Sequence, residues 1–273
     1  PPTRSSTSTP DGTGDTMVLS ETLKTELKAV HFIAGVSLYK KYCGSLIGMG
    51  WSLLNPLVQL IVYFFAFGLI IKVPIENYFV YLAAGLLPWP FISASLINSA
   101  TSITSRKGTC QNTAMPHWIF VLSDISCELF STLIAMSLLL AVAIVTSDNA
   151  PMIVVLIVPV LLPVVIFTYG AGLVVAYLGV LYRDLPHLLN LFFSVMFWLT
   201  PVVYHWTMVP KSIEVFVKYN PFAMLFGSVQ VLLHGGAAPT PDLMIATYVI
   251  ALTAAAAGIT MARRIGNKLI YAL

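Results

Sequence analysis

Six long stretches without a charged side chain constrain the fold of this chain more than any other feature. They cover residues 44–71, 77–105, 129–147, 149–182, 188–210 and 243–262. A helix needs about 20 apolar residues to cross the roughly 30 Å hydrocarbon core of a bilayer. Only 9% of the residues are charged, whereas a soluble domain carries roughly 25%. The sequence therefore predicts an all-α membrane protein with six transmembrane helices.

Lysine and arginine are divided unequally between the two sides of these six stretches. If successive connections alternate between the sides, one side holds only Lys72, Lys211 and Lys218 of the 14 basic residues. Basic residues are retained on the cytoplasmic side of a membrane. We therefore expect a multi-pass protein with both termini in the cytoplasm.

The chain before the first apolar stretch divides into two parts. Residues 1–19 are rich in Ser, Thr, Pro and Gly and are expected to form a disordered tail. Residues 20–42 repeat apolar side chains at helical spacing and predict an amphipathic helix at the cytoplasmic interface. An ordinary helix packed on the bundle is the alternative. The repeating positions are Leu23, Leu27, Val30, Ala34 and Leu38.

Sequence patterns of catalytic, cofactor-binding and metal sites are missing. There is no GxxxxGK[ST] loop, HExxH helix, paired CxxC or GxSxG elbow. We expect no enzyme activity, cofactor or metal in this chain, and no nucleic-acid partner. Asp124 and Glu128 are the only candidates for acids inside the membrane. They are interpreted as lying in the first turns of the third helix, where the helix dipole favours negative charge, rather than as an ion-coupling site.

The segment between the fifth and sixth stretches is apolar but broken by proline and glycine. Pro210, Pro221, Gly227 and the Gly235–Gly236 pair leave fragments too short to cross a bilayer. These fragments predict re-entrant or interfacial helices on the outer side.

Five sequence segments, in this order, resemble the membrane subunits of polysaccharide-exporting ABC transporters. That family contains the permeases for O-antigen, capsule and teichoic-acid export. The likeness covers nearly all of the chain after residue 36. The segments are LYKKYCGSLIGMGWSLLNP at 38–56, YLAAGLLPWPF at 81–91, LYRDLPHLL at 181–189, TPVVYHWTMVP at 200–210 and YNPF at 219–222.

The resemblance implies an assembly and a substrate. Residues 43–273 would form the six-span transmembrane domain of an exporter in the cytoplasmic membrane of a bacterium. A second copy of the chain and two ATP-binding cassette subunits would complete it, with ATP and Mg bound by those subunits. The cargo would be a lipid-linked glycan such as an O-antigen-like polysaccharide.

The resemblance also implies three groups of site residues. The loop 106–118 would couple to the ATPase, although the family's aromatic before the proline and Arg-Glu pair after it are absent here. Residues 202–235 would form an outer gate. Aromatic rings would line the substrate path, because their faces stack on many sugars. The coupling residues are Arg106, Lys107, Gln111, Asn112, Met115, Pro116, His117 and Trp118. The gate residues are Pro201, Tyr204, Trp206, Pro210, Asn220 and Pro221. The path residues are Tyr39, Tyr42, Tyr63, Phe67, Trp89, Phe91, Phe197 and Trp198.

Three other functions stay open at this point. An ABC exporter of small lipophilic molecules would have a similar architecture. An ion-coupled secondary transporter would require buried acids near the bilayer centre. A membrane-bound transferase would require clustered acid and base groups at the interface, of which Arg183 and Asp184 are the only neighbours.

Overall fold

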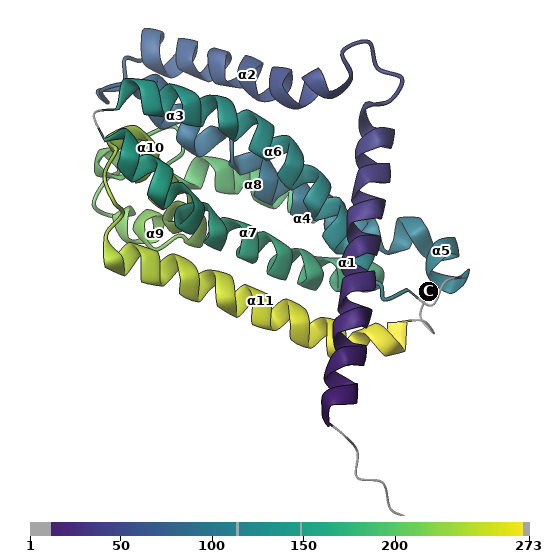
Figure 1. Cartoon of the computed structure of the whole chain (residues 1–273). Helices are drawn as coiled ribbons and strands as arrows, with labels where there is room; N and C mark the ends of the chain where they lie inside the picture. Colours follow the sequence, from purple (N-terminus) through teal and green to yellow (C-terminus); the bar gives the residue numbers. More distant parts are fainter. Residues whose placement is uncertain (1–11, 113–114, 148, 270–273) are drawn as a thin grey trace, which may run out of the picture.

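The computed structural model describes residues 12–112, 115–147 and 149–269, and within these ranges all regular structure is helical (Figure 1). Five helical segments of this part of the chain are long and apolar enough to cross a membrane. They are α2 with η2 (Trp51–Tyr63 and Phe64–Ile70), α3 with α4 (Tyr78–Leu86 and Trp89–Ser102), α6 (Trp118–Thr146), α7 (Ala150–Leu181) and α11 (Pro241–Leu269).

The predicted fifth span, residues 188–210, is not one continuous helix. Its first part belongs to α8 (Leu185–Leu199), which has 15 residues and so extends only about 22 Å at about 1.5 Å per residue. Thr200 has extended backbone angles, φ −99° and ψ 133°, because a residue before proline is disfavoured in the helical region. The uncharged stretch therefore combines a short helix with an irregular turn.

The irregular region after α8 contains short helices. They are η4 (Trp206–Met208), α9 (Glu214–Lys218) and α10 (Pro221–Gly235). The Asn220 side chain accepts a 2.9 Å hydrogen bond from the Phe222 amide at the start of α10, a typical N-cap followed by proline. Gly236 ends the helix with φ 58°, a conformation that glycine adopts without steric cost.

The second span is the innermost of the bundle. In its apolar window 78% of the residues are buried, whereas the corresponding share is 6% for Gly48–Ile70. Tyr81, Leu82 and Leu86 of α3 are buried together with Phe91 and Ile92 of α4. The core therefore lies around α3 and α4, and α2 lies at its edge.

Small residues set the close approach of the neighbouring spans. A Cβ atom on Gly170 of α7 would collide with the backbone at Ala254 and Ala255 of α11, and a Cβ atom on Gly179 would collide with the carbonyl of Ala100 in α4. Small residues let helix backbones approach in membranes, where van der Waals packing drives association. The sequence places glycine where α7 contacts α11 and α4.

Two prolines inside α7, Pro159 and Pro163, leave backbone carbonyls without their helical donors. Pro163 has no amide to donate to the carbonyl of Pro159, four residues earlier. The hydroxyl of Tyr248 in α11 donates to that carbonyl at 2.9 Å. The neighbouring helix α11 thus satisfies the carbonyl that Pro163 leaves free.

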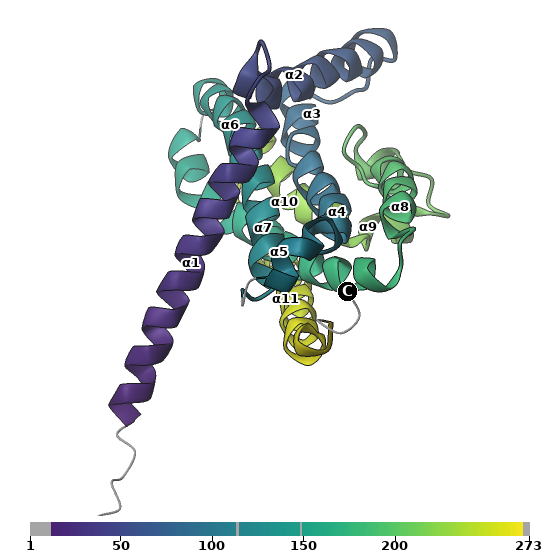
Figure 2. The same ribbon diagram turned by 90° about the vertical axis from the view of Figure 1, so that its right-hand side faces the viewer.

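The N-terminal helix α1 (Gly12–Tyr42) crosses one end of the bundle, steeply inclined to α6, α7 and α11 (Figures 1 and 2). It contacts α6. The helix begins at Gly12, inside the range 1–19 for which the composition favours disorder, and residues 1–11 lie outside the described part. A helix that lies across the ends of the spans has the direction expected of an interfacial helix.

Replacing Tyr248 with Phe removes only the hydroxyl that satisfies the Pro159 carbonyl. We expect the free energy of unfolding to fall by about 1–3 kcal/mol, because a partly buried carbonyl within a membrane-spanning helix loses its donor. Denaturation of the purified protein in mixed micelles measures this change. Tyr182→Phe is the matched control, because the Tyr182 side chain is 62% exposed. Equal stability of the two variants would contradict the role of the Tyr248 hydroxyl.

Candidate functional site

The loop between α4 and α6 lies at the end of the bundle that α1 crosses. It contains η3 (Thr104–Arg106) and the short helix α5 (Lys107–Asn112). The side chains of Gln111 and Asn112, and residues 113–114, lie outside the described part. Figures 1 and 2 show α5 projecting from this end. The predicted coupling residues thus include a six-residue helix that stands outside the packed spans.

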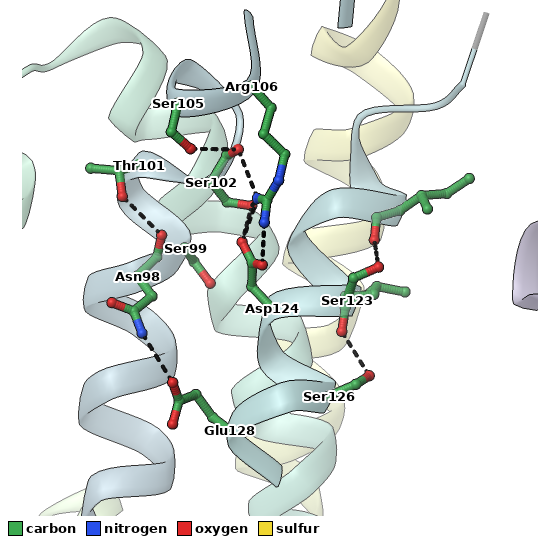
Figure 3. Close-up of polar contacts among 12 residues, drawn as sticks. Asn98, Ser99, Thr101, Ser102, Ser105, Arg106, Ser123, Asp124, Ser126 and Glu128 are labelled. Atoms are coloured by element: carbon green, nitrogen blue, oxygen red, sulfur yellow. Dashed lines mark hydrogen bonds and ion pairs between the residues drawn. The ribbon is translucent and has the colours of Figure 1, made fainter. Parts of the chain in front are cut away.

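A bidentate ion pair joins this loop to α6. The two terminal guanidinium nitrogens of Arg106 donate to the two carboxylate oxygens of Asp124 at 2.7 and 2.6 Å. The Ser102 hydroxyl donates to the same carboxylate at 2.6 Å, as Figure 3 shows. Arg106 also lies over the Phe120 ring, 5.8 Å from its centroid. Bidentate, charge-assisted hydrogen bonds fix orientation as well as distance.

A second ion pair joins α1 to α6, one helical turn further along. The Lys41 ammonium donates to both oxygens of Glu128 at 2.8 and 2.9 Å. The Asn98 amide of α4 donates to the same carboxylate at 3.3 Å. Burial lowers the pKa of Lys41, but its hydrogen bond to Glu128 and the charge of that carboxylate outweigh burial, so the pKa is raised overall. Lys41 therefore stays charged, and α1, α4 and α6 meet at Glu128.

These contacts correct the interpretation of the two acids as residues of a helix start. Helix α6 begins at Trp118, so neither Asp124 nor Glu128 lies in its first turn. The absence of charges between residues 129 and 147 made the span look shorter than it is. The acids lie within α6 because each is paired with a cation from another element. Paired carboxylates can lie inside a bundle at a much lower cost than isolated ones.

The residues around the proline of the loop differ in their surroundings. Met115 is 41% exposed, whereas His117 is 7% exposed and its Nε2 has no hydrogen-bond partner within the described residues. Burial lowers the pKa of the His117 imidazole, which favours the neutral ring. Pro116 and Trp118 are half-buried. Of the four predicted coupling residues from 115 to 118, Met115 is therefore the most accessible to a partner, which could contact it without unfolding the start of α6.

At the opposite end of the bundle, three buried side chains hold the turn that follows α8. Tyr78 donates to the carbonyl of Val203 at 2.8 Å. Tyr81 donates to the carbonyls of residues 201 and 204 at 3.1 and 2.9 Å, and the Gln230 amide donates to the carbonyl of Val202 at 3.2 Å. All four successive carbonyls are thus satisfied. Irregular backbone is tolerated at membrane depth only where protein groups satisfy it.

The predicted gate residues occupy different parts of this end. Pro201 is buried in the turn, and the hydroxyl of Tyr204 donates to the carbonyl of Trp198 at 2.9 Å. Asn220 donates to the Thr200 hydroxyl at 3.1 Å. Trp206 is 43% exposed, and Pro210 and Pro221 are exposed. Pro201, Tyr204 and Asn220 are thus built into the turn, while the other three gate residues lie on its outer surface.

Five of the eight predicted path aromatics form one connected cluster. Tyr63 lies 5.6 Å from Phe197 between ring centroids, and Phe197 lies 5.4 Å from Trp89. Phe67 and Trp198, 6.2 Å apart, are attached to the same group. Phe91 is buried in α4 outside these ring contacts, and Tyr39 and Tyr42 lie on α1, where the Tyr42 hydroxyl is 2.9 Å from that of Ser131. The cluster joins α2, α4 and α8.

The sequence analysis missed several residues of these sites. Gln230 is an uncharged polar residue inside an apolar run, and its 5% exposure shows that it faces the core. Ser102 occupies a similar position in α4, at 2% exposure. An isolated polar side chain in an apolar helix is the signal that could have identified both, since such groups need internal partners. Phe193 and Phe222 extend the aromatic cluster beyond Trp89.

Comparison with known proteins identifies related membrane proteins. The chain is 30% identical over 205 residues to the O-antigen export system permease protein RfbA of Klebsiella pneumoniae, covering 75% of this chain and 79% of the relative. A second K. pneumoniae protein of the same name is 29% identical over the same shares. The protein of that name from Myxococcus xanthus is 26% identical over 228 residues, covering 82% of this chain and 88% of the relative. No family model matches the chain.

A double-mutant cycle on Arg106→Gln and Asp124→Asn tests the ion pair that joins the loop to α6. We expect each single variant to lower the free energy of unfolding by about 1–3 kcal/mol, because hydrogen bonds to charged groups are lost. The double variant should lose about as much as either single one, giving a coupling energy of about 1–3 kcal/mol. Lys107→Gln combined with Asp124→Asn is the control and should be additive. Additivity in both cycles would remove the proposed link.

Proposed function

We propose that this chain, which belongs to the family of O-antigen export permeases of ABC transporters, is the transmembrane subunit of an ATP-driven exporter of a lipid-linked polysaccharide. The observation that carries this proposal is the similarity to O-antigen export permeases over three quarters of the chain. The five long apolar helices fit a permease of this kind. The short helices α5, α9 and α10 supply elements that could serve for coupling and gating.

The chain is proposed to cross the cytoplasmic membrane of a bacterium six times. Helix α8 and the turn at residues 200–204 together make the remaining crossing, since protein side chains satisfy the turn. Helices α9 and α10 re-enter from the outer side. Both termini then lie in the cytoplasm, in agreement with the distribution of lysine and arginine.

The permease is proposed to act as a homodimer with two ATP-binding cassette subunits. Only 6% of the residues in the apolar window of Gly48–Ile70 are buried within one copy. The exposed apolar side chains of this span include Val58, Ile61 and Phe65. A second copy packed against α2 would cover this surface. The two bundles would then enclose a path between them.

The loop 106–118 is proposed to dock on the ATPase, which would bind ATP and Mg. Movement of α5 would pass to α6 through Arg106 and Asp124, and to α1 and α4 through Glu128. ATP can open the path only if the closed ATPase dimer binds the open bundle more tightly than the closed one. The two ion pairs provide rigid connections for such a transfer.

The aromatic cluster at Tyr63, Phe67, Trp89, Phe197 and Trp198 is proposed to form part of the glycan path. Trp198 is 52% exposed, so part of its side chain is accessible while Tyr63, Phe67 and Phe197 lie against it. Ring faces stack on sugars of many kinds and offer repeated weak contacts. The turn held by Tyr78, Tyr81 and Gln230 would gate the outer end.

Co-purification with the ATP-binding cassette subunit from the same organism tests this function. Native mass spectrometry should find two copies of each chain. Met115→Glu should reduce co-purification and polysaccharide export at least tenfold, because it places a charge on the exposed apolar part of the docking loop. Lys72→Glu, at the opposite end and outside the proposed gate, is the control and should leave both unchanged. Equal behaviour of the two variants, or a chain that exports without any ATPase, would refute the proposal.

A further inference from the structure

A pocket of about 380 Å³ opens at the end of the bundle where α4 passes into η3 and α5. Its walls come from elements far apart in the sequence. Thr101 and Thr104 line one side, and Val180 of α7 and Pro186 of α8 line the other. This volume lies within the range of small-ligand sites, which is about 300–1,000 Å³.

Two cations also line this pocket. Lys107 is the first residue of α5, and Arg183 lies in the turn between α7 and α8; both are exposed. Within the described residues neither forms a salt bridge, whereas Lys41 and Arg106 each have an acid partner. The nearest acid in sequence, Asp184, is not among the lining residues. The pocket therefore brings together two cations, and no carboxylate of the described residues forms an ion pair with either.

The surroundings of the pocket are both polar and apolar. The Thr101 and Thr104 hydroxyls each donate to a backbone carbonyl one turn earlier, so neither hydroxyl has a proton left to donate to a ligand. The donors available to a ligand are thus those of Lys107 and Arg183. Tyr182 directly precedes Arg183 in the chain and Leu188 follows Pro186 by two residues, and these two apolar side chains are 62% and 60% exposed. An anionic group attached to an apolar body matches this arrangement.

We propose that the pocket binds the phosphate group of a membrane lipid, held between Lys107 and Arg183 with the acyl or prenyl chains along Tyr182 and Leu188. Arg recognises phosphate through its planar donors and Lys binds it as a point charge. Basic pockets between transmembrane helices commonly bind lipid head groups. A free anion would gain nothing from the exposed apolar side chains, which favours a lipid over dissolved phosphate. The proposal holds whatever substrate the exporter carries.

Native mass spectrometry of the purified full-length chain tests the site. The detergent-solubilised protein is titrated separately with phosphatidylglycerol, a polyprenyl phosphate, phosphatidylcholine and inorganic phosphate. The double substitution Lys107→Gln with Arg183→Gln should weaken phosphatidylglycerol and polyprenyl phosphate binding about 25-fold, because each cation near an anionic lipid contributes roughly fivefold. Phosphatidylcholine binding should change little.

Two matched variants control for charge and folding. Lys72→Gln with Lys211→Gln removes the same charge outside the pocket and should leave lipid binding unchanged. Lys107→Arg with Arg183→Lys keeps both cations and should retain it. Unchanged phosphatidylglycerol affinity in the pocket variant would overturn the proposal. Displacement of the lipid by inorganic phosphate at equal concentration would overturn the lipid as ligand. If the Lys107→Gln with Arg183→Gln variant loses ATPase binding but keeps its lipid affinity, the proposal is also overturned, and the pocket would instead bind an acidic side chain of the ATPase.

Discussion

Lipid offers no hydrogen bonds, so a polar group that faces the inside of this bundle is stabilised only by a partner within the protein. Three parts of the structure depend on this constraint. Tyr248 satisfies the carbonyl that Pro163 leaves free in α7. Tyr81 and its neighbours satisfy the turn that follows α8. Arg106 neutralises Asp124 within α6. Proline, irregular backbone and charge are all tolerated here because side chains from other helices compensate for them.

The same contacts divide the molecule into fixed and accessible parts. The second span is deeply buried and carries the tyrosines that hold the outer turn, while its far end leads into the loop anchored on α6. Among the five long apolar helices the segment that contains α2 has the smallest share of buried residues, and Met115 of the loop is exposed. Partners can therefore contact this chain at its edges. Helix α6 connects those edges, because α1 and η3 meet it through ion pairs and α4 meets it through the Asn98 hydrogen bond. This arrangement suits a subunit that must transmit movement.

The sequence predicted the membrane environment and most of the spans correctly, because a long uncharged stretch has few other solutions. The lengths of two helices, α6 and α8, were predicted wrongly, because the limits of an uncharged stretch do not coincide with the ends of the helix there. Helix α6 is longer than predicted because paired acids can lie inside a bundle, and pairing depends on Lys41 and Arg106, which are distant in sequence from their partners. Helix α8 is shorter than predicted because Thr200 precedes proline and leaves the helical region. Gln230 was missed because its role depends on a turn that only the folded structure places beside it.

The central claim is that the loop containing α5 and the region around α9 face opposite sides of a membrane. Two single-cysteine variants test this claim directly: Gly108→Cys and Lys211→Cys, each introduced into a chain in which Cys43, Cys110 and Cys127 have been replaced. The labelling is done in cells whose outer envelope layers are permeable to the reagent and whose cytoplasmic membrane is intact. A membrane-impermeant maleimide should label the cysteine at position 211 at once, and the cysteine at position 108 only after the cytoplasmic membrane is opened. Labelling of both from the same side would contradict the proposed crossing of the membrane.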